Sequence, residues 1–134
     1  MNKILFICLG NVARSQMAES FYNQMTNSKN ATSAGLLDFT PEKYVNPTKE
    51  VIEVMMEEGI DVSQNRVKFL TKEMVADNDH IYVLCEEEKC PDFLLNSGKV
   101  IFWGNIEDPF ATDTDNFRKK RDLIKNKILS IISQ

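Results

Sequence analysis

The sequence contains no apolar run long enough to cross a bilayer, which argues against a membrane protein. Its first ten residues resemble a secretory signal only faintly, because the apolar run is short and no small-residue cleavage site follows. Positive charge is also scarce: 20 Asp and Glu outnumber 16 Lys and Arg, and the net charge is −4. Such a chain is not expected to bind nucleic acid, so any anion must be held by local geometry.

Cysteines are few and odd in number: the 134 residues contain three, without a paired Cys-x2-Cys motif. This favours thiols that are used for chemistry in a reducing cytoplasm. A zinc site made of the three cysteines and His80 is conceivable by count, but His80 and Cys85 would point to opposite faces of one strand. The sequence also lacks repeats and linkers, so residues 1–134 are expected to form one domain. We expect the chain to be monomeric.

Strand and helix signals alternate along the chain. Strand-forming runs are expected at Lys3–Ile7, Ala31–Ala34, His80–Cys85 and Val100–Trp103. Helices are expected at Gln16–Met25, Pro47–Glu58, Thr71–Ala76 and Asp115–Ser133. This alternation predicts an α/β fold: a single three-layer domain, with a four-stranded parallel sheet and helices on both faces.

The stretch from Cys8 to Ser15 joins the first strand to the first helix. Loop amides at a helix N-terminus bind anions, and an arginine adds a planar fork of donors. The oxyanion is therefore expected to contact Leu9, Gly10, Asn11, Val12, Ala13 and Arg14. Cys8 lies where its nucleophilic thiolate is favoured, and Ser15 could hydrogen-bond the sulfur or cap the helix. A lone cysteine after a strand is often a core residue, but here strand, turn, arginine and helix start are in register. The pattern predicts covalent catalysis on an oxyanion such as phosphate.

Asp108 follows the fourth strand and is a candidate general acid. A carboxylic acid at that point could protonate an oxygen leaving group, and Pro109 would stiffen the loop that presents it. Glu107 competes with Asp108 for this role.

Cys85 ends the third strand, five residues before Cys90. Because the carboxyl ends of parallel strands meet at one edge, Cys8, Cys85 and the loop after Trp103 should converge there. If Cys85 reaches Cys8, the two can form a disulfide, and Cys90 can then attack Cys85 by thiol exchange. Two unrelated thiols remain the simpler interpretation of this pair.

Taken together, these motifs resemble those of the low-molecular-weight protein tyrosine phosphatase superfamily. Within it, the chain most resembles the thioredoxin-coupled arsenate reductases, over nearly its whole length from Lys3 to the final helix. The stretches that carry the resemblance are Cys8–Asn11, Arg14–Glu19, Ser33–Gly35, Val45–Pro47, Ile60–Ser63, Cys90-Pro91 and Trp103-Gly104 through Asp108-Pro109.

The resemblance implies a role for each of these residues. Cys8 would attack arsenate, Arg14 and the loop amides would hold its oxygens, and Asp108 would protonate the departing water. Cys85 would then attack Cys8 and release arsenite, and Cys90 would move the disulfide outward for reduction by thioredoxin. No tightly bound cofactor is implied, although some members bind potassium beside the loop. The matching positions here, which could equally serve as hydrogen-bonding and capping residues, are Asn11, Glu19, Ser33 and Asp61.

Two features of the sequence differ from the reductases and leave a tyrosine phosphatase as the alternative function. The spacer between Cys85 and Cys90 is shorter than is typical of the reductases. The loop at 36–44 is longer and contains Phe39 and Tyr44, and Phe110 follows Asp108-Pro109. In the tyrosine phosphatases, aromatic residues in this loop line a deep cleft for phosphotyrosine. A non-catalytic oxyanion-binding or redox-sensing protein is a third class, but nucleophile, arginine and acid together argue against it.

Overall fold

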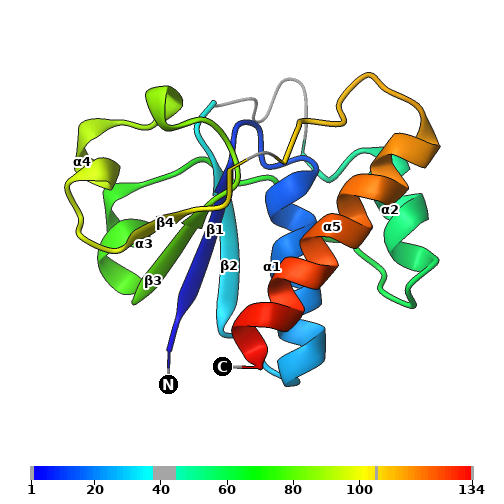
Figure 1. The fold of residues 1–134 in the computed structure, drawn as a ribbon, viewed down its shortest axis with the longest axis horizontal. Coiled ribbons are helices and arrows are strands. Elements are labelled where there is room, and N and C mark those ends of the chain that lie inside the picture. Colours follow the sequence, from blue (N-terminus) through cyan, green and yellow to red (C-terminus); the bar gives the residue numbers. More distant parts are fainter. Residues whose placement is uncertain (1, 38–44, 105, 134) are drawn as a thin grey trace.

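A central sheet of four parallel strands, in the order β2-β1-β3-β4, organises the chain (Figure 1). The computed structural model describes residues 2–37, 45–104 and 106–133. The strands are β1 (Ile4–Cys8), β2 (Ala31–Gly35), β3 (His80–Val83) and β4 (Val100–Phe102). The helices are α1 (Arg14–Thr26), α2 (Lys49–Met56), α3 (Lys72–Asp77), α4 (Asp92–Leu95) and α5 (Thr114–Ile132), with a 3₁₀ turn η1 (Glu87–Lys89). The predicted α/β fold class is confirmed.

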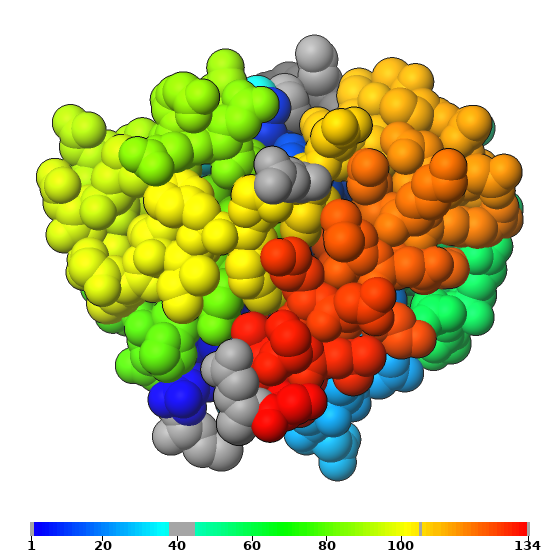
Figure 2. Space-filling model, viewed as in Figure 1, coloured from blue at the N-terminus to red at the C-terminus, as the bar shows by residue number. Residues whose placement is uncertain are grey.

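Strand β1 is buried on both faces, as its continuous apolar sequence requires. Phe6 and Cys8 point into a core cluster formed with α1, α2 and α5. Leu5 and Ile7 point into a second cluster on the other face, which includes residues of α3 and α4. In Figure 1 the two helix groups lie on opposite sides of the sheet, and in Figure 2 α5, in orange and red, covers much of the visible face. The domain therefore has three layers, with the carboxyl end of β1 at the centre of one sheet edge.

Several element boundaries differ from the sequence-based expectation. Helix α2 begins at Lys49 rather than Pro47, because Thr48 keeps an extended backbone as its N-cap residue. Strand β3 ends at Val83, so Cys85 lies two residues beyond it, although the N–H of Leu84 still bonds the Ile7 carbonyl (2.7 Å). The short elements η1 and α4 were not predicted, because elements of three and four residues leave no periodic pattern.

Helix α2 ends at Met56, two residues before the expected Glu58, and Gly59 terminates it as the sequence predicts. Gly59 has a φ of +77°, and the N–H of Ile60 bonds back to the carbonyl of Met55 (3.1 Å), as in a Schellman-type helix end. Phe39 and Tyr44, in the loop expected to be longer than in the reductases, lie outside the described residues. Among the residues described, no helix is long and apolar enough to span a bilayer.

Candidate active site

The thiol of Cys8 lies buried at the carboxyl end of β1, with two hydrogen-bond partners. Its Sγ is 2.9 Å from Ser15 Oγ, and the Asn11 backbone N–H donates to it (3.3 Å). The Asn11 Nδ2, which can only donate, gives a hydrogen bond to the same Ser15 Oγ (2.7 Å). The Ser15 hydroxyl therefore accepts from Asn11 and has its own proton available for the sulfur. Both contacts therefore place a hydrogen-bond donor at the sulfur of Cys8.

Asn11 holds the loop in an unusual backbone conformation. Its φ is +58°, a left-handed value that asparagine tolerates better than most residues. Its Oδ1 accepts from Gln16 Nε2 (3.0 Å) and from the backbone N–H of Lys68 (2.8 Å). Of the two roles predicted for Ser15, the structure places it at the sulfur, whereas the N-cap position of α1 is Ala13.

The loop from 9 to 13 has several of its carbonyls bonded to other parts of the chain. The Leu9 carbonyl accepts from Leu36 N–H (2.8 Å) and Leu37 N–H (2.9 Å), and the Val12 carbonyl accepts from Thr48 N–H (3.4 Å). Because carbonyls would repel an oxyanion, tying them outward leaves the backbone amides and the start of α1 to form the anion site.

Gly35, at the end of β2, lets this loop lie directly against the sheet. A Cβ atom on Gly35 would stand 2.8 Å from the backbone carbon of Gly10 and 2.9 Å from the nitrogen of Asn11, closer than real contacts allow. The sequence indicated Gly35 only as the residue ending a strand. Its role as a spacer under the loop depends on a long-range contact that the local pattern does not contain.

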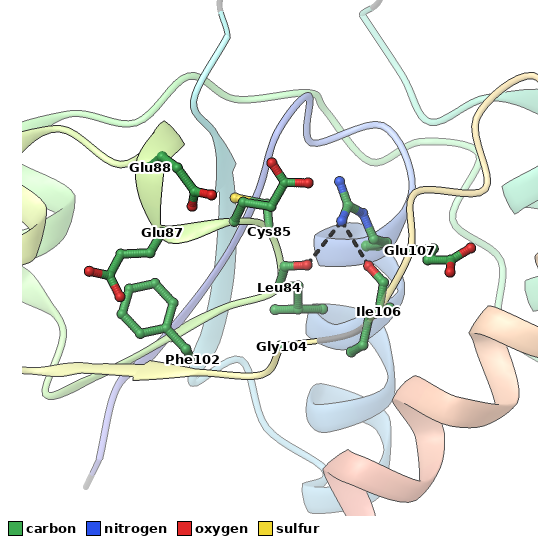
Figure 3. A pocket seen from close by; sticks show the side chains of 10 residues that line it. Leu84, Cys85, Glu87, Glu88, Phe102, Gly104, Ile106 and Glu107 are labelled. Carbon is green, nitrogen blue, oxygen red and sulfur yellow. Dashed lines mark hydrogen bonds between the residues drawn. The ribbon is translucent and has the colours of Figure 1, made fainter.

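Arg14, the first residue of α1, is buried and anchored on two carbonyls. Its Nη1 donates to the carbonyls of Leu84 and Ile106, both at 2.9 Å (Figure 3). Its Nη2 lies 3.6 Å from Asp108 Oδ2. The guanidinium is thus fixed in orientation before any oxyanion binds, and Asp108 rather than Glu107 is the carboxylate paired with it.

A small hollow of about 170 Å³ brings together four of the predicted site residues, whereas Cys8 and Cys90 are not among the residues that line it. It is lined by Leu9, Arg14, Cys85, Glu86, Lys89 and Asp108. Lys89 was not identified from the sequence, because the 3₁₀ turn that directs it toward the hollow was not predicted. A larger hollow of about 510 Å³ adjoins it through Arg14 and Cys85, with Phe102 and a group of glutamates in its walls (Figure 3).

The three cysteines are free thiols; Cys8 belongs to the core cluster on the α1 side of the sheet, whereas Cys85 and Cys90 belong to the cluster on the other side. Burial, followed by the charges of Cys8 and Cys90, raises the pKa of Cys85 to about 12. Burial, followed by the charge of Glu87, also raises the pKa of Cys90, and a hydrogen bond with Cys85 opposes that shift. Cys85 is therefore held in the protonated form at neutral pH.

Comparison with known proteins identifies the family. A family model described as "Low molecular weight phosphotyrosine protein phosphatase" matches residues 3–134. The chain belongs to this family. The resemblance inferred from the motifs is thereby confirmed.

Individual members of this phosphatase family are similar over almost the whole chain. Arsenate reductase 1 of Staphylococcus epidermidis is 36% identical over 128 residues, covering 93% of this chain and 91% of that protein. Arsenate reductase 2 of Staphylococcus haemolyticus is 33% identical over 129 residues, covering 95% and 93%. Among solved structures, Vibrio vulnificus Wzb in complex with benzylphosphonate superposes with a TM-score of 0.84 at 25% identity, over 96% of this chain and 95% of that one.

The potassium site expected in some members of the family does not fit the residues here. The Oδ1 of Asn11 already accepts two N–H donors. Glu19 Oε1 accepts from Ser33 Oγ (2.8 Å) and lies 3.4 Å from Lys68 Nζ, so a lysine ammonium already lies at this carboxylate. Hydrogen bonds from the side chain and then the backbone N–H of Ser63 (2.9 Å for the N–H) lower the pKa of Asp61, and within the described ranges Asp61 makes no hydrogen bond to the other three residues.

A zinc site has no support in the described part of the chain, where no three His, Cys, Asp or Glu side chains are grouped to hold a metal ion. His80 begins β3, whereas Cys85 follows the end of that strand. The two residues therefore lie toward opposite ends of the strand.

Proposed function

We propose that this protein reduces arsenate to arsenite through a three-cysteine relay that a thioredoxin-type dithiol protein regenerates. The position of Cys85 carries the proposal, because this residue lines the same hollow as Arg14 and Asp108, and the charges of Cys8 and Cys90 both raise its pKa. A phosphatase needs no such pair of additional thiols beside its nucleophile. Two relatives that align over more than 90% of the chain are named arsenate reductases, which supports the same conclusion.

The small hollow suits an oxyanion of arsenate size. Arg14, held by the carbonyls of Leu84 and Ile106, would present its free donors to two oxygens, and the loop amides would bind the others. Lys89 in the wall of the hollow adds a further positive charge. Since the chain as a whole is acidic, these local donors would provide the attraction for a dianion.

In the first step the Cys8 thiolate would attack arsenic and form an S–As bond. One As–O bond breaks, and Asp108 would protonate the departing oxygen so that it leaves as water. In the second step the Cys85 thiolate attacks Cys8 Sγ and forms a disulfide. The electron pair of the S–As bond stays on arsenic, which is thereby reduced from As(V) to As(III) and leaves as arsenite.

Because the pKa of Cys85 is about 12, Cys85 would have to lose its proton before the second step. Burial is the main cause of that high value, and the charge of the Cys8 thiolate adds to it. Because the arsenic group on Cys8 would carry its own negative oxygens, Arg14, whose charge lowers the pKa of Cys85, would be the residue that favours the Cys85 thiolate in the second step.

Cys90 would complete the relay by attacking Cys85 and freeing Cys8. The spacer between Cys85 and Cys90 is short, but η1 lies within it, and the Cys90 N–H bonds the Glu87 carbonyl (3.0 Å). The Cys90 thiol donates to the Glu86 carbonyl (3.9 Å), and Cys85 lowers the pKa of Cys90, so the turn keeps the two thiols near each other. Thioredoxin would then reduce the Cys85–Cys90 disulfide, which is consistent with a monomeric protein in a reducing cytoplasm.

A tyrosine phosphatase remains the second candidate, because the hollow of about 510 Å³ beside Arg14 is larger than arsenate needs. Phe102 in its wall could pack against a phosphorylated side chain. The deciding experiment assays the purified protein with arsenate, thioredoxin, thioredoxin reductase and NADPH, and separately with an aryl phosphate. Sustained arsenite formation supports the reductase, whereas aryl phosphate hydrolysis without arsenite formation would replace it with the phosphatase.

A further inference from the structure

Lys68 contacts the nucleophile loop and its surroundings through both backbone and side chain. Its N–H donates to Asn11 Oδ1 (2.8 Å), and its carbonyl accepts from the N–H of Gly35 (2.8 Å). Its ammonium lies 3.4 Å from Glu19 Oε1 and donates to the carbonyl of Arg66 (3.2 Å). One residue thus links the loop, the end of β2 and helix α1.

Glu19 needs a positive partner where it lies. Its side chain is only 16% exposed, and its Oε1 also accepts from Ser33 Oγ (2.8 Å). A carboxylate this far removed from water is costly unless it is paired. Within the described ranges, Lys68 is the cation recorded at Glu19.

A chain of hydrogen bonds connects Lys68 to the nucleophile Cys8. From the Lys68 N–H, hydrogen bonds run to Asn11 Oδ1, from Asn11 Nδ2 to Ser15 Oγ, and from Ser15 to Cys8 Sγ. A negative charge left unpaired at Glu19 would lie beside this chain of bonds and oppose a thiolate at its end. The charge on Lys68 is therefore coupled to the reactivity of Cys8.

We infer that Lys68 is a positioning residue for the Cys8 nucleophile, and that its ammonium supplies the positive charge for which other members of the family use a metal cation. Glu19 is the group through which that charge acts. The nucleophile loop of this protein is consequently complete without potassium. The inference concerns the thiol and its loop, so it does not depend on whether arsenate or a phosphate ester is the substrate.

The test measures the rate at which iodoacetamide alkylates Cys8, with mass spectrometry locating the label. Lys68→Met should slow alkylation by about fivefold, since it leaves Glu19 unpaired while keeping the backbone contacts. Adding Glu19→Gln to Lys68→Met should restore a rate within about twofold of wild type, because the unpaired charge is then gone. A purely structural role for the lysine stem would not be rescued in this way. Lys29→Met, at an exposed position, changes the net charge equally and should leave the rate unchanged.

A second measurement compares wild-type alkylation rates and melting temperatures in KCl, NaCl and choline chloride at equal ionic strength. All three salts should give the same values. A potassium-specific increase in either quantity would overturn the inference, as would a wild-type rate in Lys68→Met or a slow rate in the double variant. If Lys68→Met does not fold, a double variant that folds and reacts at a near wild-type rate supports the inference, because removing the Glu19 charge then restores folding, whereas a double variant that also fails to fold overturns it.

Discussion

Arg14 and Asp108 form an ion pair at the rim of the oxyanion hollow, with 3.6 Å between Nη2 and Oδ2. The arginine is buried and held by two main-chain carbonyls, whereas the aspartate side chain is 43% exposed. The anchored partner can bind substrate while the exposed partner stays free to exchange a proton with a leaving group. The pairing of these two residues, ninety-four positions apart, favours Asp108 as the general acid.

Asp108→Asn should therefore lower kcat by about 10²-fold with little change in KM, because its proton matters in the transition state. The neighbouring substitution Glu107→Gln is the matched control and should retain near-normal kcat. Steady-state kinetics with arsenate, or with an aryl phosphate for the alternative, provide the measurement. If Glu107→Gln lost activity instead, Glu107 rather than Asp108 would be the general acid.

Gly35 should not tolerate a side chain. In Gly35→Ala the new Cβ would press on Gly10 and Asn11, and we expect a loss of about 1–3 kcal/mol in the free energy of unfolding. Because the loop would shift, Cys8 alkylation should slow as well. Gly104→Ala is the control, since a Cβ there meets no atom within 4 Å. Equal stability of the two variants in urea unfolding would show that the loop can move away without cost.

The residues of this site differ in how far the sequence alone could identify them. Cys8, Arg14 and Ser15 were identifiable because strand end, loop and helix start are consecutive in the chain. Asp108 and Cys85 were expected nearby because parallel strands end at one edge. Lys68 and Lys89 escaped notice because their roles depend, respectively, on a contact fifty-seven residues away and on a three-residue turn without a periodic signal.

Glu57 should make a pH-dependent contribution to the free energy of unfolding. Hydrogen bonds from Arg118 and then Arg121 hold the pKa of Glu57 at about 2, below its ordinary value of 4.5. A depressed pKa stabilises the fold above the ordinary value, and this contribution is lost as the pH falls from 4.5 toward 2. Wild type should therefore be more stable than Glu57→Gln at pH 7, and the difference should shrink over that interval.

Urea unfolding of the two proteins at several pH values measures this difference directly. Glu53→Gln on the same helix, at an exposed position without a recorded ion pair among the described residues, should show no such pH-dependent gap. A gap for Glu57→Gln that stays constant down to pH 2 would mean that the arginines do not stabilise its charged form.

The outer cysteines separate the reductase from the phosphatase. A phosphatase regenerates Cys8 by hydrolysis, whereas reduction of arsenic needs a second thiol to take up the sulfur of Cys8. Cys85→Ser should consequently stop arsenite release, although Cys8 can still be alkylated. Cys90→Ser should release about one arsenite per enzyme and then stall as a Cys8–Cys85 disulfide, because the relay cannot pass it outward. Single-turnover arsenite measurements, with mass spectrometry of the disulfides, follow both variants.

The order of attack is the decisive part of this experiment. Cys85 interacts with both other thiols, so the first disulfide should join Cys8 to Cys85. A Cys8–Cys90 bond in wild type or in Cys85→Ser would instead mean that the short spacer lets Cys90 act first.

Cys8→Ser should abolish arsenite formation and any aryl phosphate hydrolysis, whereas the two outer variants should keep any such hydrolysis under reducing conditions. Repeated arsenite formation by both outer variants with thioredoxin would contradict the relay, since thioredoxin itself would then supply the thiol that attacks Cys8.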